Sequence, residues 1–196
     1  GLEGAPLREE EELHGLVIIH RIGQPHTGGG QSRRLTGAQR VGPVGQTGFV
    51  GGATLRQAVG AGWHVRALTR RAQEAREGVT WVSGALDNRE SLAELAAGAD
   101  VVLHIAGVVN VSTRADFEAG NATATANVVE AARSASVRRF VHVSSLAARE
   151  PGLSNYGWSK ERAEKVVEDS GLDWTIIRPP AVFGPGDTEM LDLFRM

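Results

Sequence analysis

The sequence predicts an α/β protein built on a doubly wound parallel sheet. From about residue 44 onward, apolar segments of strand length alternate with segments of helical periodicity. Short turns separate these segments, and residues 101–105 form a continuous apolar run, as expected of a strand that is buried on both faces of a sheet. Because strands joined by helices form right-handed crossovers, we expect the strands to run parallel.

The expected elements follow one another closely along the chain. Helices are expected over residues 49–61, from about 91 to 98, and over 117–132 and 156–169, and strands over 63–69, 79–82, 101–105, 140–143 and 174–177. Gly62, Gly98 and Gly171 each follow a helical segment, where glycine commonly ends a helix. Ser91 and Glu94 have the spacing of a capping box that starts or reinforces the second helix.

The first 43 residues differ in character from the rest. They contain the glycine run 28–30 and show little periodicity. Glycine and proline at 42–43 stand where a central strand needs β-forming residues and backbone donors. We therefore expect residues 1–43 to be foreign to the domain or disordered, and residues 44–196 to form the domain. The alternative, in which residues 16–19 supply the missing strand across a long loop, is disfavoured because such loops are uncommon.

Composition excludes several classes of function. The chain has 196 residues, 41% of them hydrophobic, and a formal net charge of -2, which is ordinary for a globular domain and argues against a basic nucleic-acid-binding surface. Cysteine is absent, which excludes disulfides, thiolate metal sites and a cysteine nucleophile. The apolar run at 16–19 is too short for a membrane span or a secretion signal. We expect a cytoplasmic protein with no metal site and no membrane or nucleic-acid partner.

A glycine-rich turn leads directly into the first expected helix. Gly45, Gly48 and Gly51 would let the backbone approach a pyrophosphate, which the free N–H groups and the dipole of a helix N-terminus attract. Glycine makes up 25 of the 196 residues, so the pattern alone also fits an ordinary strand-to-helix turn. Its position before a helix and a further strand favours a dinucleotide-binding unit.

Two arginines indicate which dinucleotide this unit binds. Arg70 and Arg71 follow the strand 63–69, about 20 residues beyond the glycine turn. Enzymes that use NAD usually carry an acidic residue here for the ribose 2′-hydroxyl, whereas arginine accommodates the 2′-phosphate of NADP. A solvated surface charge is an equal alternative for Arg71. The sequence thus predicts NADP through Arg70, with NAD as the less favoured cofactor.

A third pattern indicates catalysis of proton transfer. Tyr156 and Lys160 lie four residues apart in an expected helix and so share one face of it. A nearby ammonium favours the phenolate form of a tyrosine and readies it to exchange a proton with a carbinol or carbonyl oxygen. Upstream, Ser144 and Ser145 follow the strand 140–143, at the end where parallel sheets bind ligands. Each feature alone has an ordinary structural explanation, such as a turn cap for the serines.

In combination, these motifs resemble the extended short-chain dehydrogenases/reductases. That family includes nucleotide-sugar epimerases and dehydratases and 3β-hydroxysteroid-dehydrogenase-like reductases. The resemblance covers about residues 44–196. The matching segments, in order, are GQTGFVGG at 45–52, HIAG at 104–107, NATATANVVEAA at 121–132, RFVHVSS at 139–145, YGWSK at 156–160 and RPPAVFGPG at 178–186.

The resemblance implies a Rossmann-like domain and a role for each matching residue. Tyr156 would be the acid/base, Lys160 would bind the nicotinamide ribose, and Ser145 would orient the substrate oxygen. Asn121 matches a position next to the site, while His104 and His142 are expected to be packed histidines within strands. The implied cofactor contacts, beyond Tyr156, Lys160 and Arg70, are Gly45, Thr47, Gly48, Phe49, Val50 and Gly51 at the pyrophosphate, Asp87 at the adenine, Ala106 and Gly107 beside the cofactor, and Pro179 and Val182 near the nicotinamide.

The function implied by the resemblance is hydride transfer at a carbinol or carbonyl carbon of a small-molecule substrate. Oxidoreduction and the epimerase or dehydratase reactions on nucleotide sugars share the same residues. A non-catalytic NADP-binding regulator, an assembly subunit and an inactive fragment are the alternatives. Family members continue into a C-terminal region that forms much of the substrate pocket, so we expect a substrate region truncated at Met196. By the same analogy, the long expected helices could pair between the subunits of a homodimer.

Overall fold

The computed structural model describes residues 16–20 and 48–184 of the chain. The strands are β1 (Leu16–His20), β2 (His64–Thr69), β3 (Val79–Ser83), β4 (Val101–His104), β5 (Arg139–Val143) and β6 (Asp173–Ile177). The helices are α1 (Phe49–Gly60), α2 (Arg89–Ala96), α3 (Arg114–Phe117), the π-helix η1 (Glu118–Thr123), α4 (Ala124–Ser134), the 3₁₀ turn η2 (Leu146–Arg149) and α5 (Asn155–Glu168). None of these helices is long and apolar enough to cross a membrane.

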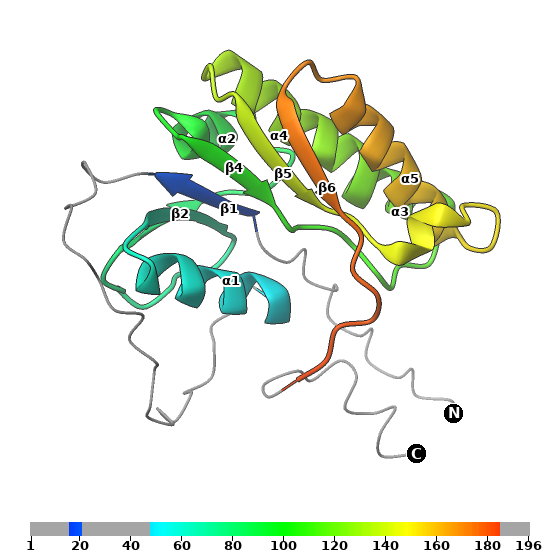
Figure 1. Cartoon of the computed structure of the whole chain (residues 1–196), viewed down its shortest axis with the longest axis horizontal. Coiled ribbons are helices and arrows are strands. Elements are labelled where there is room, and N and C mark those ends of the chain that lie inside the picture. Colours follow the sequence, from blue (N-terminus) through cyan, green and yellow to red (C-terminus); the bar gives the residue numbers. More distant parts are fainter. Residues whose placement is uncertain (1–15, 21–47, 185–196) are drawn as a thin grey trace, which may run out of the picture.

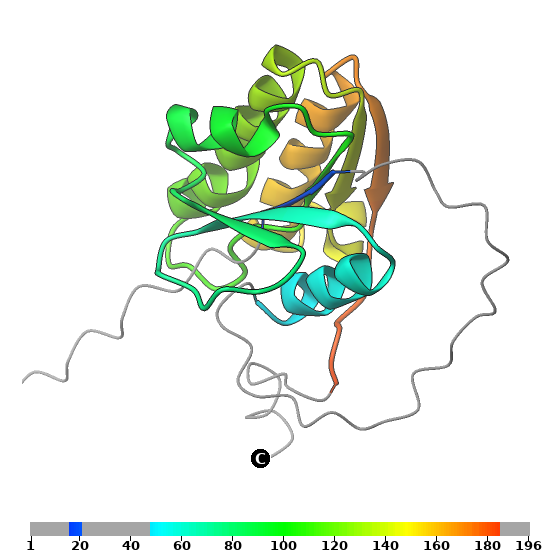
Figure 2. The ribbon, with the colours of Figure 1, turned by 90° about the vertical axis from the view of Figure 1, so that its left-hand side faces the viewer.

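The strands form one six-stranded sheet in the order β3-β2-β1-β4-β5-β6, with helices on both faces. Helix α1 packs on one face against β1 and β2 (Figures 1 and 2). Helices α2, α4 and α5 cover the other face, and α4 contacts both α2 and α5. The doubly wound α/β fold expected from the sequence is confirmed. In such sheets ligands bind outside the carboxyl ends of the parallel strands, where the strand order reverses.

Two expectations are wrong for β1. The strands were expected to be parallel throughout, but β1 is antiparallel to both neighbours, with Val17 opposite Ala67 of β2 and Leu103 of β4. The disfavoured segment 16–19 is also the one that lies in the centre of the sheet. The physical reason is that the inner edges of β2 and β4 need hydrogen-bonding partners, and antiparallel pairing satisfies them at least as well as parallel pairing. The weak strand at 40–44 lies outside the described residues, and the foreign origin of residues 1–43 stays a prediction.

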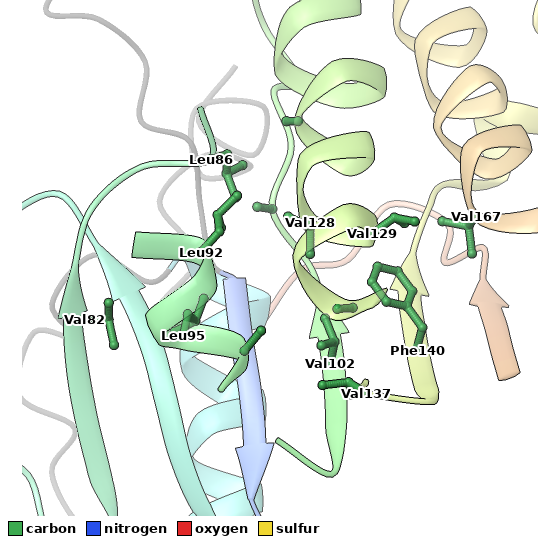
Figure 3. Close-up of a cluster of buried hydrophobic side chains, with 14 residues drawn as sticks. Val82, Leu86, Leu92, Leu95, Val102, Val128, Val129, Val137, Phe140 and Val167 are labelled. Atoms are coloured by element: carbon green, nitrogen blue, oxygen red, sulfur yellow. The ribbon is translucent and has the colours of Figure 1, made fainter. Parts of the chain in front are cut away.

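Two apolar clusters lie on opposite faces of the sheet. The smaller one, beneath α1, contains Leu55, Ala58, Val65 and Ala67. The larger one fills the space between the sheet and the opposite helices, and Figure 3 shows several of its side chains converging from α2, α4, β4 and β5. Its members are Val82, Leu86, Leu92, Leu95, Ala96, Val102, Ala106, Ala124, Val128, Val129, Ala132, Val137, Phe140 and Val167. Burial of this apolar surface is the main stabilising term for the domain.

Two helices differ from the sequence expectation. The single helix expected over 117–132 is interrupted by the π-helix η1, and it begins earlier, at a capping box of Thr113 and Asp116. The capping box expected at Ser91 and Glu94 is wrong, because Asn88 caps α2 by accepting a hydrogen bond from the backbone N–H of Ser91 at 2.9 Å. Asn88 lies three residues before Ser91 and offers its side-chain carbonyl to the first free donors of the helix.

Candidate cofactor and catalytic site

The segments that leave β5 and β6 are hydrogen-bonded to each other at the carboxyl edge of the sheet. The backbone N–H of Ser144 donates to the carbonyl oxygen of Ile177 at 2.7 Å, and that of Leu146 donates to Pro179 at 2.9 Å. These two bonds flank Ser145 and hold it beside Pro179. The expected substrate-orienting residue and one expected nicotinamide contact are therefore neighbours in the fold.

The glycine turn ends in a helix N-terminus that offers backbone donors. Gly48 is the N-cap of α1 with φ 67°, a conformation that favours glycine, and no side chain caps this terminus in the described part of the chain. The first turn of α1 carries no acidic residue, and Gly51 is buried within it. Phe49 and Val50 are its first two helical residues. Gly45 and Thr47 lie outside the described residues.

The turn after β4 is pinned by Asn121, which lies in the π-helix η1. The side-chain carbonyl of Asn121 accepts from the N–H of Val108 at 2.9 Å, and its amide donates to the carbonyl of Val108 at 3.0 Å and to Ser159 Oγ at 2.9 Å. A Cβ at Gly107 would lie 2.5 Å from Asn121 Oδ1 and 3.6 Å from Lys160 Nζ. Glycine at 107 therefore permits a close approach between the turn and Asn121 of η1, and π-helical segments often occur at functional sites.

The residues of the expected catalytic set lie on η2 and α5. Ser145 caps η2, and its hydroxyl oxygen accepts from the N–H of Ala147 at 3.2 Å, which leaves the hydroxyl hydrogen free to be donated elsewhere. Tyr156 lies in the first turn of α5, half-buried, with its ring 6.2 Å from that of Phe117. Lys160 follows one turn later and is buried. The start of α5 packs against η2, since a Cβ at Gly157 would lie 2.6 Å from the carbonyl oxygen of Ala147.

Lys160 is held in an apolar setting that tunes its charge. Its ammonium donates to the carbonyl of Val143, at the end of β5, at 3.0 Å. Burial lowers the pKa of Lys160 to about 8, and the nearby carboxylate of Glu164 acts in the opposite direction. The group is therefore still mostly protonated at neutral pH, but it can lose its proton within a pH range in which enzymes are studied.

The two strand histidines lie beneath Lys160 and stay neutral. His104 and His142 are fully buried, as expected of packed histidines, with ring centroids 5.2 Å apart. His104 Nε2 is hydrogen-bonded to Thr125 Oγ1 at 2.9 Å. Burial, and secondarily the charge of Lys160, lower the pKa of His104 to about 3 and that of His142 well below its usual 6.5. Neither histidine competes with Lys160 for a proton near neutral pH.

The remaining expected cofactor residues lie around the same edge. Arg70 directly follows β2 and is exposed. Asp87 is exposed in the turn after β3, where Asn127 of α4 donates to the neighbouring carbonyl of Leu86 at 2.9 Å. Ala106 is buried in the turn after β4, whereas Pro179 is half-buried and Val182 exposed after β6.

Two residues outside the expected catalytic set connect these parts. Asn121 was expected next to the site, and its three hydrogen bonds join the turn after β4 to α5. Glu164 received no role, although it is buried and forms a bidentate pair with Arg178. A signal existed in the sequence, since Glu164 is four residues beyond Lys160 on the same helix face. Its partner, 14 residues further on, could not be inferred from spacing.

The described residues fit a dinucleotide. The uncapped N-terminus of α1 behind Gly48 suits a pyrophosphate. Exposed Arg70 stands at the end of β2, where the ribose of the adenosine is bound in such folds. The donor set therefore has the chemistry that an NAD(P) molecule needs.

Similar proteins carry reductase names. Residues 45–190 match the family model described as NAD(P)H-binding. A ceramide reductase of Caulobacter vibrioides is 43% identical over 157 residues, covering 78% of this chain and 49% of that protein. The 4-hydroxy-2-methyl-3-oxo-4-farnesyl-3,4-dihydroquinoline-1-oxide ketoreductase of Stigmatella aurantiaca is 32% identical over 172 residues, covering 76% of this chain and 52% of that protein. The chain thus spans about half the length of the curated relatives it matches.

Solved structures share the fold. A short-chain dehydrogenase/reductase superfamily protein from Agrobacterium tumefaciens with bound NAD has a TM-score of 0.59 at 26% identity, covering 67% of this chain and 46% of that one. The enzyme WbmH of Bordetella bronchiseptica in complex with NAD+ has a TM-score of 0.65 at 23% identity, covering 74% of this chain and 57% of that one. On its family model, its relatives and its fold, this chain belongs to the NAD(P)H-binding family, among the extended short-chain dehydrogenases/reductases.

Proposed function

We propose that this chain is the cofactor-binding and catalytic part of an NADP(H)-dependent reductase that interconverts a ketone and a secondary alcohol. The observation that carries the proposal is the buried Lys160, held against the end of β5 one helical turn after Tyr156 and close to the Ser145 segment. The relatives named above, both reductases at 32% identity or more, favour this reaction over epimerisation.

The roles of the protein groups follow from their chemistry. The nicotinamide, when bound, supplies a hydride to the carbonyl carbon or accepts one from the alcohol carbon. Tyr156 donates a proton to the substrate oxygen during reduction and takes it back during oxidation. Ser145 donates its free hydroxyl hydrogen to the same oxygen and orients it. The Lys160 ammonium stabilises the phenolate that Tyr156 becomes.

The surface around this edge favours an apolar substrate. Exposed apolar side chains follow three successive strands, with Val109 after β4, Leu146 and Leu153 after β5, and Val182 after β6. A nucleotide sugar would need cationic groups for its phosphates, whereas an alkyl or acyl chain is bound by such apolar side chains. We therefore expect turnover of ketones with long alkyl chains before nucleotide sugars.

A titration with NADPH and NADH, followed by tryptophan fluorescence, tests the cofactor half of the proposal. We expect saturable binding, with NADPH bound roughly tenfold more tightly because Arg70 pairs with the 2′-phosphate. Arg70→Gln should remove this preference, and the matched neighbour Arg71→Gln should keep it. Equal affinity of the unmodified chain for both cofactors would rule out the preference for NADP.

Turnover by the Tyr156→Phe variant tests the catalytic half. The phenyl ring keeps the packing against Phe117 but carries no exchangeable proton. We expect NADPH binding within about twofold of the unmodified chain and a loss of roughly 10²–10⁴-fold in kcat. Equal turnover by both proteins would refute the assignment. Net consumption of NADPH separates reduction from epimerisation, which regenerates its cofactor in each cycle.

A further inference from the structure

A buried carboxylate lies one helical turn beyond Lys160. Glu164 is 2% exposed and receives two hydrogen bonds from Arg178, at 2.9 Å from Nε to Oε1 and at 2.6 Å from Nη2 to Oε2. Such side-on, two-point contact is the strong geometry for an arginine–carboxylate pair. A charge this deeply buried is costly unless it is paired, so its retention next to the catalytic lysine calls for an explanation.

Arg178 connects this carboxylate to the segment that carries Ser145. It follows the last residue of β6, and its two chain neighbours, Ile177 and Pro179, accept the backbone hydrogen bonds from Ser144 and Leu146. The pair therefore links the helix that holds Tyr156 and Lys160 to the residues on either side of Ser145. The ion pair and the two backbone bonds form one continuous connection between the catalytic groups.

Glu164 is also the acidic group that acts on the charge of Lys160. Lys160 also interacts with His104 of β4 and His142 of β5, which are neutral, and Tyr156 precedes it by one turn of α5. Burial alone favours the neutral amine, and the carboxylate of Glu164 opposes it by raising the pKa of Lys160. Removing the negative charge should therefore neutralise the lysine at lower pH.

We propose that Glu164 and Arg178 are positioning residues for the reaction: Arg178, from the strand end that also fixes Ser145, holds the buried Glu164 carboxylate one helical turn from Lys160, where it acts on the lysine side chain. The role in catalysis rests on the proposed reductase function. The effect on Lys160 does not, and it can be measured without cofactor or substrate.

The chain offers a direct readout, because lysine occurs only at Lys160 and Lys165. Selective ¹³C labelling of lysine should give two side-chain signals, whose titration is followed by NMR on the whole chain. In the Glu164→Gln variant we expect the midpoint for Lys160 to fall by about one pH unit, a tenfold change in its ammonium-to-amine ratio. Glu164→Asp, which keeps the charge, should return it towards the unmodified value.

A matched control lies on the same helix. Glu161 pairs with the exposed Lys165 four residues on, so Glu161→Gln removes a carboxylate of the same kind without touching Lys160. Its Lys160 signal should titrate as in the unmodified chain. The dispersion of the amide spectrum checks that every variant is folded. If Lys160 titrates at the same pH in Glu164→Gln and the unmodified chain, the inference is overturned, whatever the activity.

Kinetics then tests the catalytic part. The alkaline limb of the kcat/KM profile should move down with the Lys160 midpoint in Glu164→Gln and stay in place in Glu161→Gln. An alkaline limb that does not follow Lys160 would overturn the positioning role. If the unmodified chain shows no turnover while the Lys160 midpoint still falls in Glu164→Gln, the proposed reductase function fails and the effect of Glu164 on Lys160 is supported.

Discussion

The two halves of the sheet carry their chemistry in different ways. The half around β1–β3, α1 and α2, here the nucleotide half, presents backbone groups, with an uncapped helix N-terminus behind Gly48. The half around β4–β6 and α3–α5, the catalytic half, contains all but one of the buried polar residues in the described part of the chain, Ser91 being the exception. Recognition of a pyrophosphate by backbone donors tolerates many side chains, whereas proton transfer requires specific ones.

The comparison has a practical consequence. Substitutions that keep the shape of a side chain but change its charge should change activity or stability strongly in the catalytic half. In the nucleotide half the same kind of substitution should change them little. Substitutions that add a Cβ to a crowded glycine act through the backbone, and their effects should depend on the space at that position. The following predictions test this contrast.

The largest expected effect is loss of the proposed reductase activity on replacement of Lys160. Lys160→Met keeps the length of the side chain and removes its charge. We expect kcat/KM to fall by roughly 10²–10⁴-fold, because the phenolate of Tyr156 loses its stabilising ammonium. Thermal unfolding should change little, since an apolar group replaces a buried cation. Lys165→Met, with an exposed lysine on the same helix, is the control and should retain full activity.

The second prediction compares the two apolar clusters. Phe140 is fully buried in the larger cluster and Leu55 in the smaller one (Figure 3 shows the larger). Phe140→Ala should lower the free energy of unfolding by about 3–5 kcal/mol, and Leu55→Ala by about 2–3 kcal/mol. Urea denaturation measures both. A larger loss for Leu55→Ala would show that the nucleotide half, and not the catalytic half, dominates stability.

The third prediction concerns acid. The folded-state pKa of His104 is about 3, below its usual 6.5, so the unfolded chain binds the proton first. The stability that comes from keeping this histidine neutral in the folded state is fully present above pH 6.5. As the pH falls towards 3, the free energy of unfolding decreases by up to about 1.4 kcal/mol per pH unit. His142 acts in the same direction. Urea denaturation from pH 7 to pH 4 should therefore show a shallower loss of stability for His104→Leu than for the unmodified chain.

A matched substitution at a partly buried histidine controls for general acid effects. His64 lies in β2, in the nucleotide half, and is only partly buried. The pH dependence of the free energy of unfolding in His64→Gln is the baseline against which the slope of His104→Leu is compared. If His104→Leu and the unmodified chain lose stability in parallel, the histidine does not stay neutral in the folded protein.

The smallest expected effect contrasts two helical glycines. In α5, a Cβ at Gly157 would lie 2.6 Å from the carbonyl oxygen of Ala147, so Gly157→Ala should cost about 1–3 kcal/mol. In α1, nothing lies within 4 Å of a Cβ at Gly60, so Gly60→Ala should stabilise by up to about 1 kcal/mol. Melting temperatures measure both effects. If Gly60→Ala lowers the melting temperature as much as Gly157→Ala, the room available for a Cβ does not decide the outcome.

Most elements of the fold follow from local sequence. The strand 63–69 and the helix 156–169 were predicted to within one residue at each end, because the periodicity of apolar residues and the glycines after each helix are local signals. The positions of Tyr156 and Lys160 on one helix face follow from their spacing alone. The interruption of the helix over 117–132 by a π-helix could not be predicted, since it accompanies the long-range hydrogen bonds of Asn121.

The sequence by itself determined the class of fold, the order of its motifs and the residues that carry the proposed chemistry. The tertiary structure decided how those residues are connected. An apolar pattern does not encode strand direction. The antiparallel direction of β1 was set by its hydrogen bonding to the edges of β2 and β4, which only the folded chain brings together. The pairing of Glu164 with Arg178 likewise depends on α5 packing against β6, because contacts between distant residues arise from packing and not from spacing.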